Sequence, residues 1–174
     1  MHKTPETILA LDPGLRDLGY AVIAGRKLVT AGVLPLRAIP SGQRLATVGV
    51  SLESWIRGYR PTSLVVEHIP KRPLDSIAGL PALGRLIERL GRRRRLRLAT
   101  YSARTVRRTV VGNGWAGKRD AARSLSRRYP QLRVCLTQDR KWKEAYWQNM
   151  FDAVALAVHH QVGIQPPSRS RFSD

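Results

Sequence analysis

The segment from Ile8 to Ile23 constrains the fold more than any other part of the chain. It consists of a short apolar run ending in a carboxylate, a tight Pro-Gly turn and a second apolar run. This pattern places Asp12 at the end of a strand that is otherwise buried. A buried carboxylate without a partner is costly, so one held there usually meets a cation. The alternative is an ordinary hairpin, because Asp, Pro and Gly all favour turns.

The net charge of the chain points to a polyanionic partner. Lys and Arg number 31 against 12 Asp and Glu, a formal charge of +19 in 174 residues. Arginine supplies most of this charge and binds phosphate with two hydrogen bonds at once. An anionic membrane would also be attracted, but no stretch reaches the roughly 20 apolar residues of a transmembrane helix, and we expect no signal peptide. The composition therefore favours nucleic acid as the partner.

A single cysteine, Cys135, excludes an internal disulfide and a cysteine-based zinc site. This usage is typical of a reducing compartment, so we expect a cytoplasmic protein.

The periodicity of apolar residues predicts strands that alternate with helices. The predicted strands cover residues 7–11, 20–24, 28–34, 63–67 and 96–100. The predicted helices cover residues 41–59, 77–90, 103–111, 118–129 and 142–161. This order predicts an α/β fold in which a central mixed sheet is flanked by helices. We expect one domain over residues 1–163 and a flexible polar tail over residues 164–174.

Two carboxylates end predicted strands, and a third interrupts an apolar helix. Asp12 and Glu67 are expected at the same edge of one sheet, where open α/β sheets bind ligands. Asp152 lies in an apolar stretch, and Asn149 shares its helix face. Oxygen ligands of this kind suit Mg²⁺ or Mn²⁺, and two such ions about 4 Å apart promote phosphodiester cleavage. The alternative for Asp152 is a place at the solvent edge of the helix.

Four blocks of sequence together carry a family resemblance. Residues 8–23 contain the first Asp, residues 64–67 the Glu, residues 103–118 a basic segment with Val-Val-Gly-Asn-Gly, and residues 149–160 the closing helix. In this order they resemble the RuvC family of Holliday-junction resolvases, which have an RNase H-like fold. The first block occurs in many RNase H-like proteins, whereas the third makes the combination specific.

The resemblance implies a metal-dependent endonuclease that resolves four-way DNA junctions by paired symmetric nicks. Asp12, Glu67 and Asp152 then correspond to metal ligands for two Mg²⁺ or Mn²⁺ ions. Asn149 is the fourth candidate ligand, and Lys118 stabilises charge in the transition state. A homodimer is expected because a four-way junction needs two symmetric cuts, and in the resembling family the helix over residues 77–90 forms the interface.

Basic residues supply the expected DNA contacts. From Arg85 to Lys143 the chain has 19 basic residues against three acidic ones, which favours a phosphate-binding face. The expected DNA-binding residues are Arg104, Arg107, Arg108, Lys118, Arg119, Arg92, Arg93, Arg94, Arg95, Lys71 and Arg72.

The chain departs from the family pattern at two places. Asn149 stands where the family usually has Asp or His, and a neutral amide is a weaker ligand. Residues 68–73 stand where the family often places an aromatic wedge near the junction centre. Tyr101 and Trp115 are therefore the candidates for opening the junction.

Three other functions are weighed against this one. The first is a junction-binding protein with weak or lost nuclease activity, because of Asn149. The second is another RNase H-like nuclease, acting on RNA/DNA hybrids or branched DNA. A basic structural protein is the third, and it would leave the three carboxylates unexplained. His159 and His160 are expected to be structural or to face solvent.

Overall fold

The fold is built on one five-stranded sheet. The computed structural model describes residues 6–69, 79–136 and 141–164, with side chains of the last segment from residue 146 to 163. The strands are β1 (Thr7–Asp12), β2 (Asp17–Ala24), β3 (Lys27–Pro35), β4 (Ser63–Glu67) and β5 (Arg97–Tyr101). Their order is β3-β2-β1-β4-β5; β1, β4 and β5 are parallel, and β2 is antiparallel to both of its neighbours. The expected mixed sheet is confirmed.

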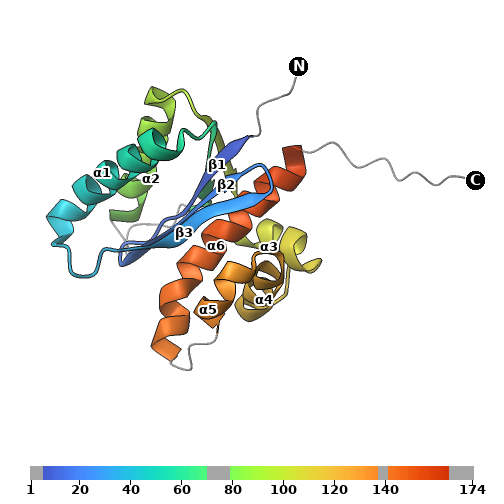
Figure 1. Ribbon diagram of the computed structural model, residues 1–174. Helices are drawn as coiled ribbons and strands as arrows, with labels where there is room; N and C mark the ends of the chain where they lie inside the picture. The colour runs from blue at the N-terminus through green and yellow to red at the C-terminus, as the bar shows by residue number, and fades with distance from the viewer. Residues whose placement is uncertain (1–5, 70–78, 137–140, 165–174) are drawn as a thin grey trace, which may run out of the picture.

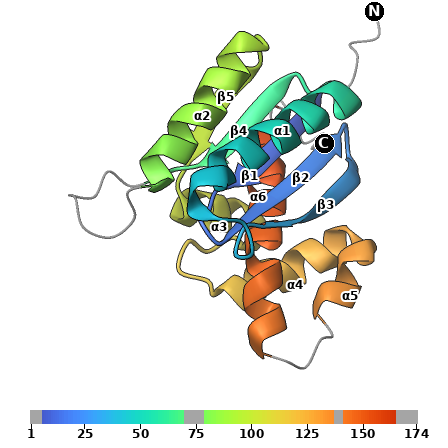
Figure 2. The same ribbon diagram turned by 90° about the vertical axis from the view of Figure 1, so that its left-hand side faces the viewer.

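Helices cover the two faces of this sheet (Figures 1 and 2). One face carries α1 (Ser41–Tyr59) and α2 (Gly79–Arg93). The long α6 (Lys141–Ile164) crosses the other face and contacts β1, β2, β3 and β4. Packed against α6 are α3 (Ala103–Val111), α4 (Lys118–Arg128) and the short α5 (Arg133–Leu136), which a 3₁₀ turn over Pro130–Leu132 precedes. This turn and α5 were not expected from the sequence.

The alternation of side chains along β1 divides the core into two layers. Ile8 and Ala10 pack in the layer that contains α6, whereas Leu9 and Leu11 pack in the layer with α1 and α2. Residues two apart in a strand share a face, so Asp12 continues the face of Ile8 and Ala10. The carboxylate at the end of β1 therefore lies on the α6 side of the sheet.

The helix predicted to end at residue 90 is longer in the structure. It continues through the buried Gly91 to Arg93. A Cβ at position 91 would lie 2.5 Å from Leu98 Cδ2 and 2.9 Å from Leu64 Cδ2. The glycine marks a close approach of α2 to two leucine side chains of the sheet, and the helix continues through it despite its low helix propensity.

Several expected residues fall outside the described part of the chain. These are Lys71, Arg72 and the polar tail beyond Ile164, the residue that ends α6. Within residues 6–69, 79–136 and 141–164, no helix combines the length and apolar character needed to cross a bilayer.

Candidate metal centre and DNA interface

The three predicted carboxylates meet at one edge of the sheet. Asp12, Glu67 and Asp152 each offer an oxygen, and these atoms all lie within 4.8 Å of one another. We call this set the acidic cluster. All three residues are half-buried. Residues far apart in the chain therefore form one concentrated negative site.

Parallel pairing of β1 and β4 brings the first two carboxylates together. Leu11 pairs with Val66, so Asp12 and Glu67 follow side by side at the ends of the two strands. Val65 packs in the α6 layer, and Glu67, two residues on, shares that face. The expectation that both carboxylates lie at the same sheet edge is confirmed.

Gly19 lets α6 deliver the third carboxylate. It lies opposite Asp12 on β2. A Cβ at position 19 would lie 1.9 Å from the backbone oxygen of Asn149 and 2.8 Å from the backbone nitrogen of Met150. The helix backbone therefore rests directly on this glycine, and Asp152 lies one helical turn beyond the contact. A glycine inside a strand is a signal of close backbone approach, which the sequence analysis did not use.

The electrostatics of the acidic cluster are unfavourable without a cation. Burial raises the pKa of Asp12 well above its usual range, the charges of Glu67 and Asp152 raise it further, and Lys118 lowers it only in part. The pKa of Glu67 is also raised, first by burial and then by Asp152, against the lowering effects of Lys118 and Arg107. Burial and mutual repulsion thus oppose ionisation, and a divalent cation would relieve both. The donor set fits a hard cation, because all three donors are carboxylate oxygens.

Two neighbours hold Asp152 in place. The Lys118 Nζ lies 3.5 Å from Asp152 Oδ2, from its place at the first residue of α4. Gln148, one turn earlier on α6, donates from Nε2 to Asp152 Oδ1 at 3.0 Å. Lys118 was predicted from the sequence and Gln148 was not, although the spacing of four residues between Gln148 and Asp152 is the signal that finds such helix pairs.

Arg107 lies on α3, and its charge lowers the pKa of Glu67. Its Nε is buried and has no hydrogen-bond partner within the described residues. A buried donor without an acceptor is costly, and a phosphate oxygen would satisfy it.

Comparison with known proteins agrees with this geometry. The family model of the crossover junction endodeoxyribonuclease RuvC matches residues 8–160. The chain belongs to the RuvC family. One relative, the RuvC of Nocardioides sp. strain JS614, is 29% identical over 160 residues, which cover 88% of this chain and 85% of that protein. The chain is therefore a crossover junction endodeoxyribonuclease, as the sequence predicted.

Solved structures of Holliday junction resolvases share the fold of this chain. Thermus thermophilus RuvC in complex with a Holliday junction substrate matches with a TM-score of 0.72 and 18% identity, over 91% of this chain and 96% of that chain. The yeast mitochondrial Holliday junction resolvase matches with a TM-score of 0.62 and 11% identity, over 90% and 78% of the two chains. The RNase H-like α/β fold expected from the sequence is confirmed.

The side-chain amide of Asn149 is hydrogen-bonded to the backbone of β2 in this RuvC-family chain. Its Nδ2 donates to the backbone oxygen of Asp17 at 2.7 Å. Asp17 is buried and accepts from Arg37 Nε at 3.0 Å, and the two residues form an ion pair. The hydrogen bond turns the Nδ2 end of the Asn149 amide toward β2. The Oδ1 atom is the acceptor that this side chain still offers.

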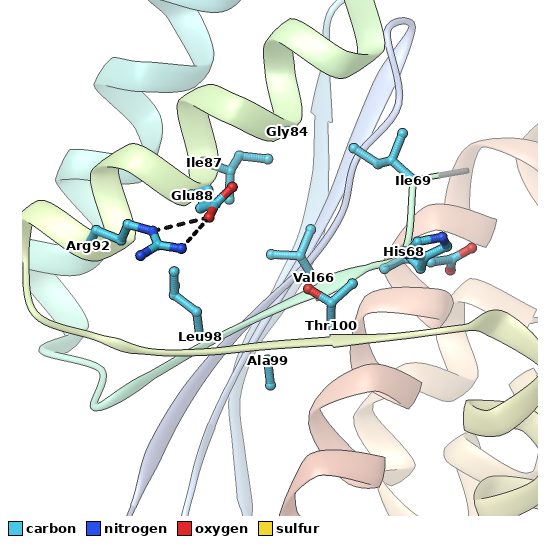
Figure 3. A pocket seen from close by; sticks show the side chains of 11 residues that line it. Val66, His68, Ile69, Gly84, Ile87, Glu88, Arg92, Leu98, Ala99 and Thr100 are labelled. Atoms are coloured by element: carbon cyan, nitrogen blue, oxygen red, sulfur yellow. Dashed lines mark hydrogen bonds and ion pairs between the residues drawn. The ribbon is translucent and has the colours of Figure 1, made fainter. Parts of the chain in front are cut away.

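The arginine run at the end of α2 lies away from the acidic cluster. Arg97 pairs with Ser63 at the start of β4, whereas Glu67 ends that strand. A groove between α2 and β5 joins the two regions, with His68 near one end and the Arg92–Glu88 ion pair near the other (Figure 3). Arg93 and Arg94 both pair with Glu53. Among the candidates, Arg92 therefore lines the same groove as Glu67, whereas Arg93 and Arg94 are turned to Glu53 and Arg95 follows them.

Tyr101 is half-buried and packs against the core layer that contains α6. Its ring meets the ring of His159 edge-on at 4.4 Å, and its hydroxyl is hydrogen-bonded to His160 Nδ1 at 2.9 Å. His159 Nδ1 is also 2.6 Å from the Thr109 hydroxyl. Both histidines are thus structural, as expected, and Trp115 is the candidate that stays exposed.

Proposed function

We propose that the acidic cluster is the centre at which this RuvC-family nuclease cuts four-way DNA junctions. The observation that supports this most is the convergence of three carboxylate oxygens within 4.8 Å at the edge of a protein with a net charge of +19. Acidic side chains in so basic a chain suit a nucleic-acid substrate. The carboxylates would bind metal ions at the phosphate that is cut, and the basic side chains would contact the other phosphates. We further propose one nuclease domain over residues 1–163, acting on DNA in the cytoplasm.

Each residue has a proposed role in the reaction. Asp12, Glu67 and Asp152 hold Mg²⁺ or Mn²⁺, two ions per site, and Asn149 adds a neutral oxygen. When bound, such ions polarise the phosphate and lower the pKa of water. Lys118 lies beside Asp152, where its ammonium meets charge that develops on the phosphate oxygens. Arg107 orients the same phosphate through its unpaired Nε.

Basic residues of α3 and α4 would hold neighbouring phosphates. Arg104 and Arg108 lie on α3, and Arg119 follows Lys118 on α4. These contacts fix the position of the DNA without reading its sequence. Lys71 and Arg72 are proposed contacts outside the described residues, and Arg92, Arg93, Arg94 and Arg95 are proposed to reach a junction arm farther from the cut.

Competition among substrates tests the proposed function. A labelled four-way junction is challenged with unlabelled junction, duplex or RNA/DNA hybrid at about 0.1 M salt, because affinity without a stated salt concentration means little. We expect the junction to compete best and to be nicked in two opposite strands when Mg²⁺ or Mn²⁺ is added. Preferred binding and cutting of the hybrid would favour a different RNase H-like activity.

Replacing Lys118 by Ala is expected to slow cutting by about 10²- to 10³-fold, because one charge aimed at the transition state is lost. Junction affinity should change little, since many other basic residues contact phosphate. Single-turnover cutting and a binding titration measure the two effects. Lys27→Ala, at the exposed first residue of β3, is the matched control and should cut normally. An unchanged rate for Lys118→Ala would remove this residue from the mechanism.

The neutral side chain of Asn149 favours a second candidate, a junction-binding protein with weakened nuclease activity. Replacing Asn149 by Asp should lower the Mg²⁺ concentration for half-maximal cutting by about tenfold, because a charged ligand binds the ion more tightly. The same change should destabilise the metal-free protein by about 1–3 kcal/mol, since Asp cannot donate to the Asp17 carbonyl.

Asn149→Ala separates the two roles of the amide. It should lose the same hydrogen bond and raise the Mg²⁺ requirement. An Mg²⁺ requirement that is equal in wild type and Asn149→Ala would show that the amide is not a ligand. The second candidate would be established if the wild-type protein binds junctions without cutting them and the Asn149→Asp variant cuts them.

A homodimer is proposed because two symmetric nicks need two sites. Leu83, Ile87 and Leu90, on the helix that the family resemblance implies as the interface, are buried in the protomer core, so the proposed interface uses other residues. The outer groove between α1 and α2 offers Val50, 72% exposed, and Leu45, 37% exposed. Light scattering at micromolar concentration should report a dimer, and Val50→Asp should shift it to monomer. A monomer in the wild type would contradict the proposal.

A further inference from the structure

Trp115 is the most exposed Trp, Tyr or Phe residue whose side chain the structure describes, at 79% of its surface. It lies in the loop between α3 and α4. Lys118 follows three residues later and reaches Asp152. Three residues span at most about 11 Å, so the indole is within that backbone distance of a residue of the proposed active site.

The loop around Trp115 is held by specific contacts. Gly112 ends α3 with φ +82°, which favours glycine. Asn113 accepts the backbone N–H of Trp115 on Oδ1 at 2.9 Å and that of Ala116 on its backbone oxygen at 3.2 Å. Gly114 is buried against Arg104, where a Cβ would lie 3.2 Å from Arg104 Cγ. The indole therefore projects from a constrained turn.

Arg104 covers one face of the exposed ring. Its guanidinium carbon lies 4.1 Å from the ring centroid of Trp115. This contact orients the indole and adds positive charge beside it. A ring with one face on a guanidinium and most of its surface exposed has its other face open to solvent. The arrangement is a flat apolar surface next to a phosphate-binding charge.

We propose that Trp115 stacks on an unpaired base at the crossover of the junction, with Arg104 supporting the ring from behind. Aromatic side chains and arginine together form the platforms on which proteins stack single-stranded bases. Inside a duplex both faces of each base are covered by its neighbours, so an indole finds a free base face where the helical stack is interrupted. Trp115 therefore makes a contact that distinguishes a junction from a duplex. This inference rests on the proposed function of the acidic cluster.

Binding of Trp115 variants to junction and duplex tests the inference. In an Asp12→Asn background, which should prevent cutting, Trp115→Ala should weaken junction binding by roughly 5- to 100-fold and leave duplex binding within about twofold. Trp115→Phe should restore most of the junction affinity, because a smaller ring still stacks. Binding of the junction should quench tryptophan fluorescence, and this quenching should be smaller in Trp115→Phe than in the protein that retains Trp115. Trp55→Phe is the control, since Trp55 stacks on Tyr20 away from the loop.

The outcomes separate this inference from the proposed function. Trp115→Ala that binds the junction as wild type does, or that loses junction and duplex affinity equally, overturns stacking at the crossover. A change of oligomeric state in Trp115→Ala, measured by light scattering, overturns it too, because the ring would then contact a second copy. If wild type neither prefers nor cuts junctions, the proposed function itself fails.

Discussion

Replacing Asp12 by Asn is expected to slow junction cutting by about 10³-fold or more, with junction affinity within about twofold of wild type. The substitution keeps the shape of the side chain and removes one charge from the acidic cluster. Metal ligation contributes several kcal/mol of transition-state stabilisation, and each 1.36 kcal/mol corresponds to about a factor of ten. Single-turnover cutting of a synthetic junction and a binding titration of the same junction measure the two quantities.

The same substitution should stabilise the metal-free protein. Burial and two neighbouring carboxylates raise the pKa of Asp12, so its charge costs folding free energy at neutral pH. Removing the charge should increase the free energy of unfolding by about 1 kcal/mol, a rise in Tm of about 2–4 °C. A group with a raised folded-state pKa loses stability as pH rises, so this gain should vanish below about pH 4 and grow toward neutral pH.

Thermal melts with and without Mg²⁺ check the second effect. Mg²⁺ should raise the Tm of wild type more than that of Asp12→Asn, because the ion binds the folded site. Glu88→Gln is the matched control, an exposed carboxylate on the far part of α2, and should change neither cutting nor the response to Mg²⁺. Normal cutting by Asp12→Asn would contradict the assignment of the acidic cluster as the nuclease centre.

Replacing Gly19 by Ala is expected to destabilise the protein by about 3 kcal/mol, the upper part of the range for overpacked sites. The added Cβ would lie 1.9 Å from the Asn149 backbone oxygen and 2.2 Å from its carbonyl carbon. Backbone atoms cannot rotate away as a flexible side chain can, so α6 must move off β2. The Tm should fall by about 6–12 °C.

Cutting should also fall in Gly19→Ala, because the movement of α6 carries Asp152 away from Asp12. Activity is measured well below the lowered Tm, so that loss of the site is separated from unfolding. Gly58→Ala is the control: nothing lies within 4 Å of its added Cβ in α1, and it should raise stability by up to about 1 kcal/mol. A folded Gly19→Ala protein with wild-type activity would show that the close contact is not needed to place Asp152.

Local pattern was enough to predict most helices and strands. The helices over residues 41–59 and 103–111 and the strand over residues 63–67 have the predicted bounds. Their apolar spacing and flanking turn residues act over a few positions, so one stretch of sequence contains the signal. The helix end predicted at residue 90 was wrong because Gly91 packs against Leu64 and Leu98, which lie outside the helix on the sheet.

The chemistry of the site was also visible in the sequence. Asp12 and Glu67 end apolar strands, and period-two alternation places each on the α6 side of the sheet. Lys118 stood in a basic segment typical of the family. The partners that orient these residues were not visible, since Gln148 and the Asn149–Asp17 contact depend on where α6 lies on the sheet.

The amino-acid sequence by itself determined the fold class, the family and the identity of the three carboxylates, because each depends on residue types and their spacing. Only the tertiary structure decided that the carboxylates converge, that Arg93 and Arg94 pair with Glu53 of α1, and that Tyr101 is packed while Trp115 is exposed. For the carboxylates, the physical reason is the packing of α6 on Gly19. A close backbone contact between residues 130 positions apart sets the distance between Asp12 and Asp152, and local periodicity contains no information about it.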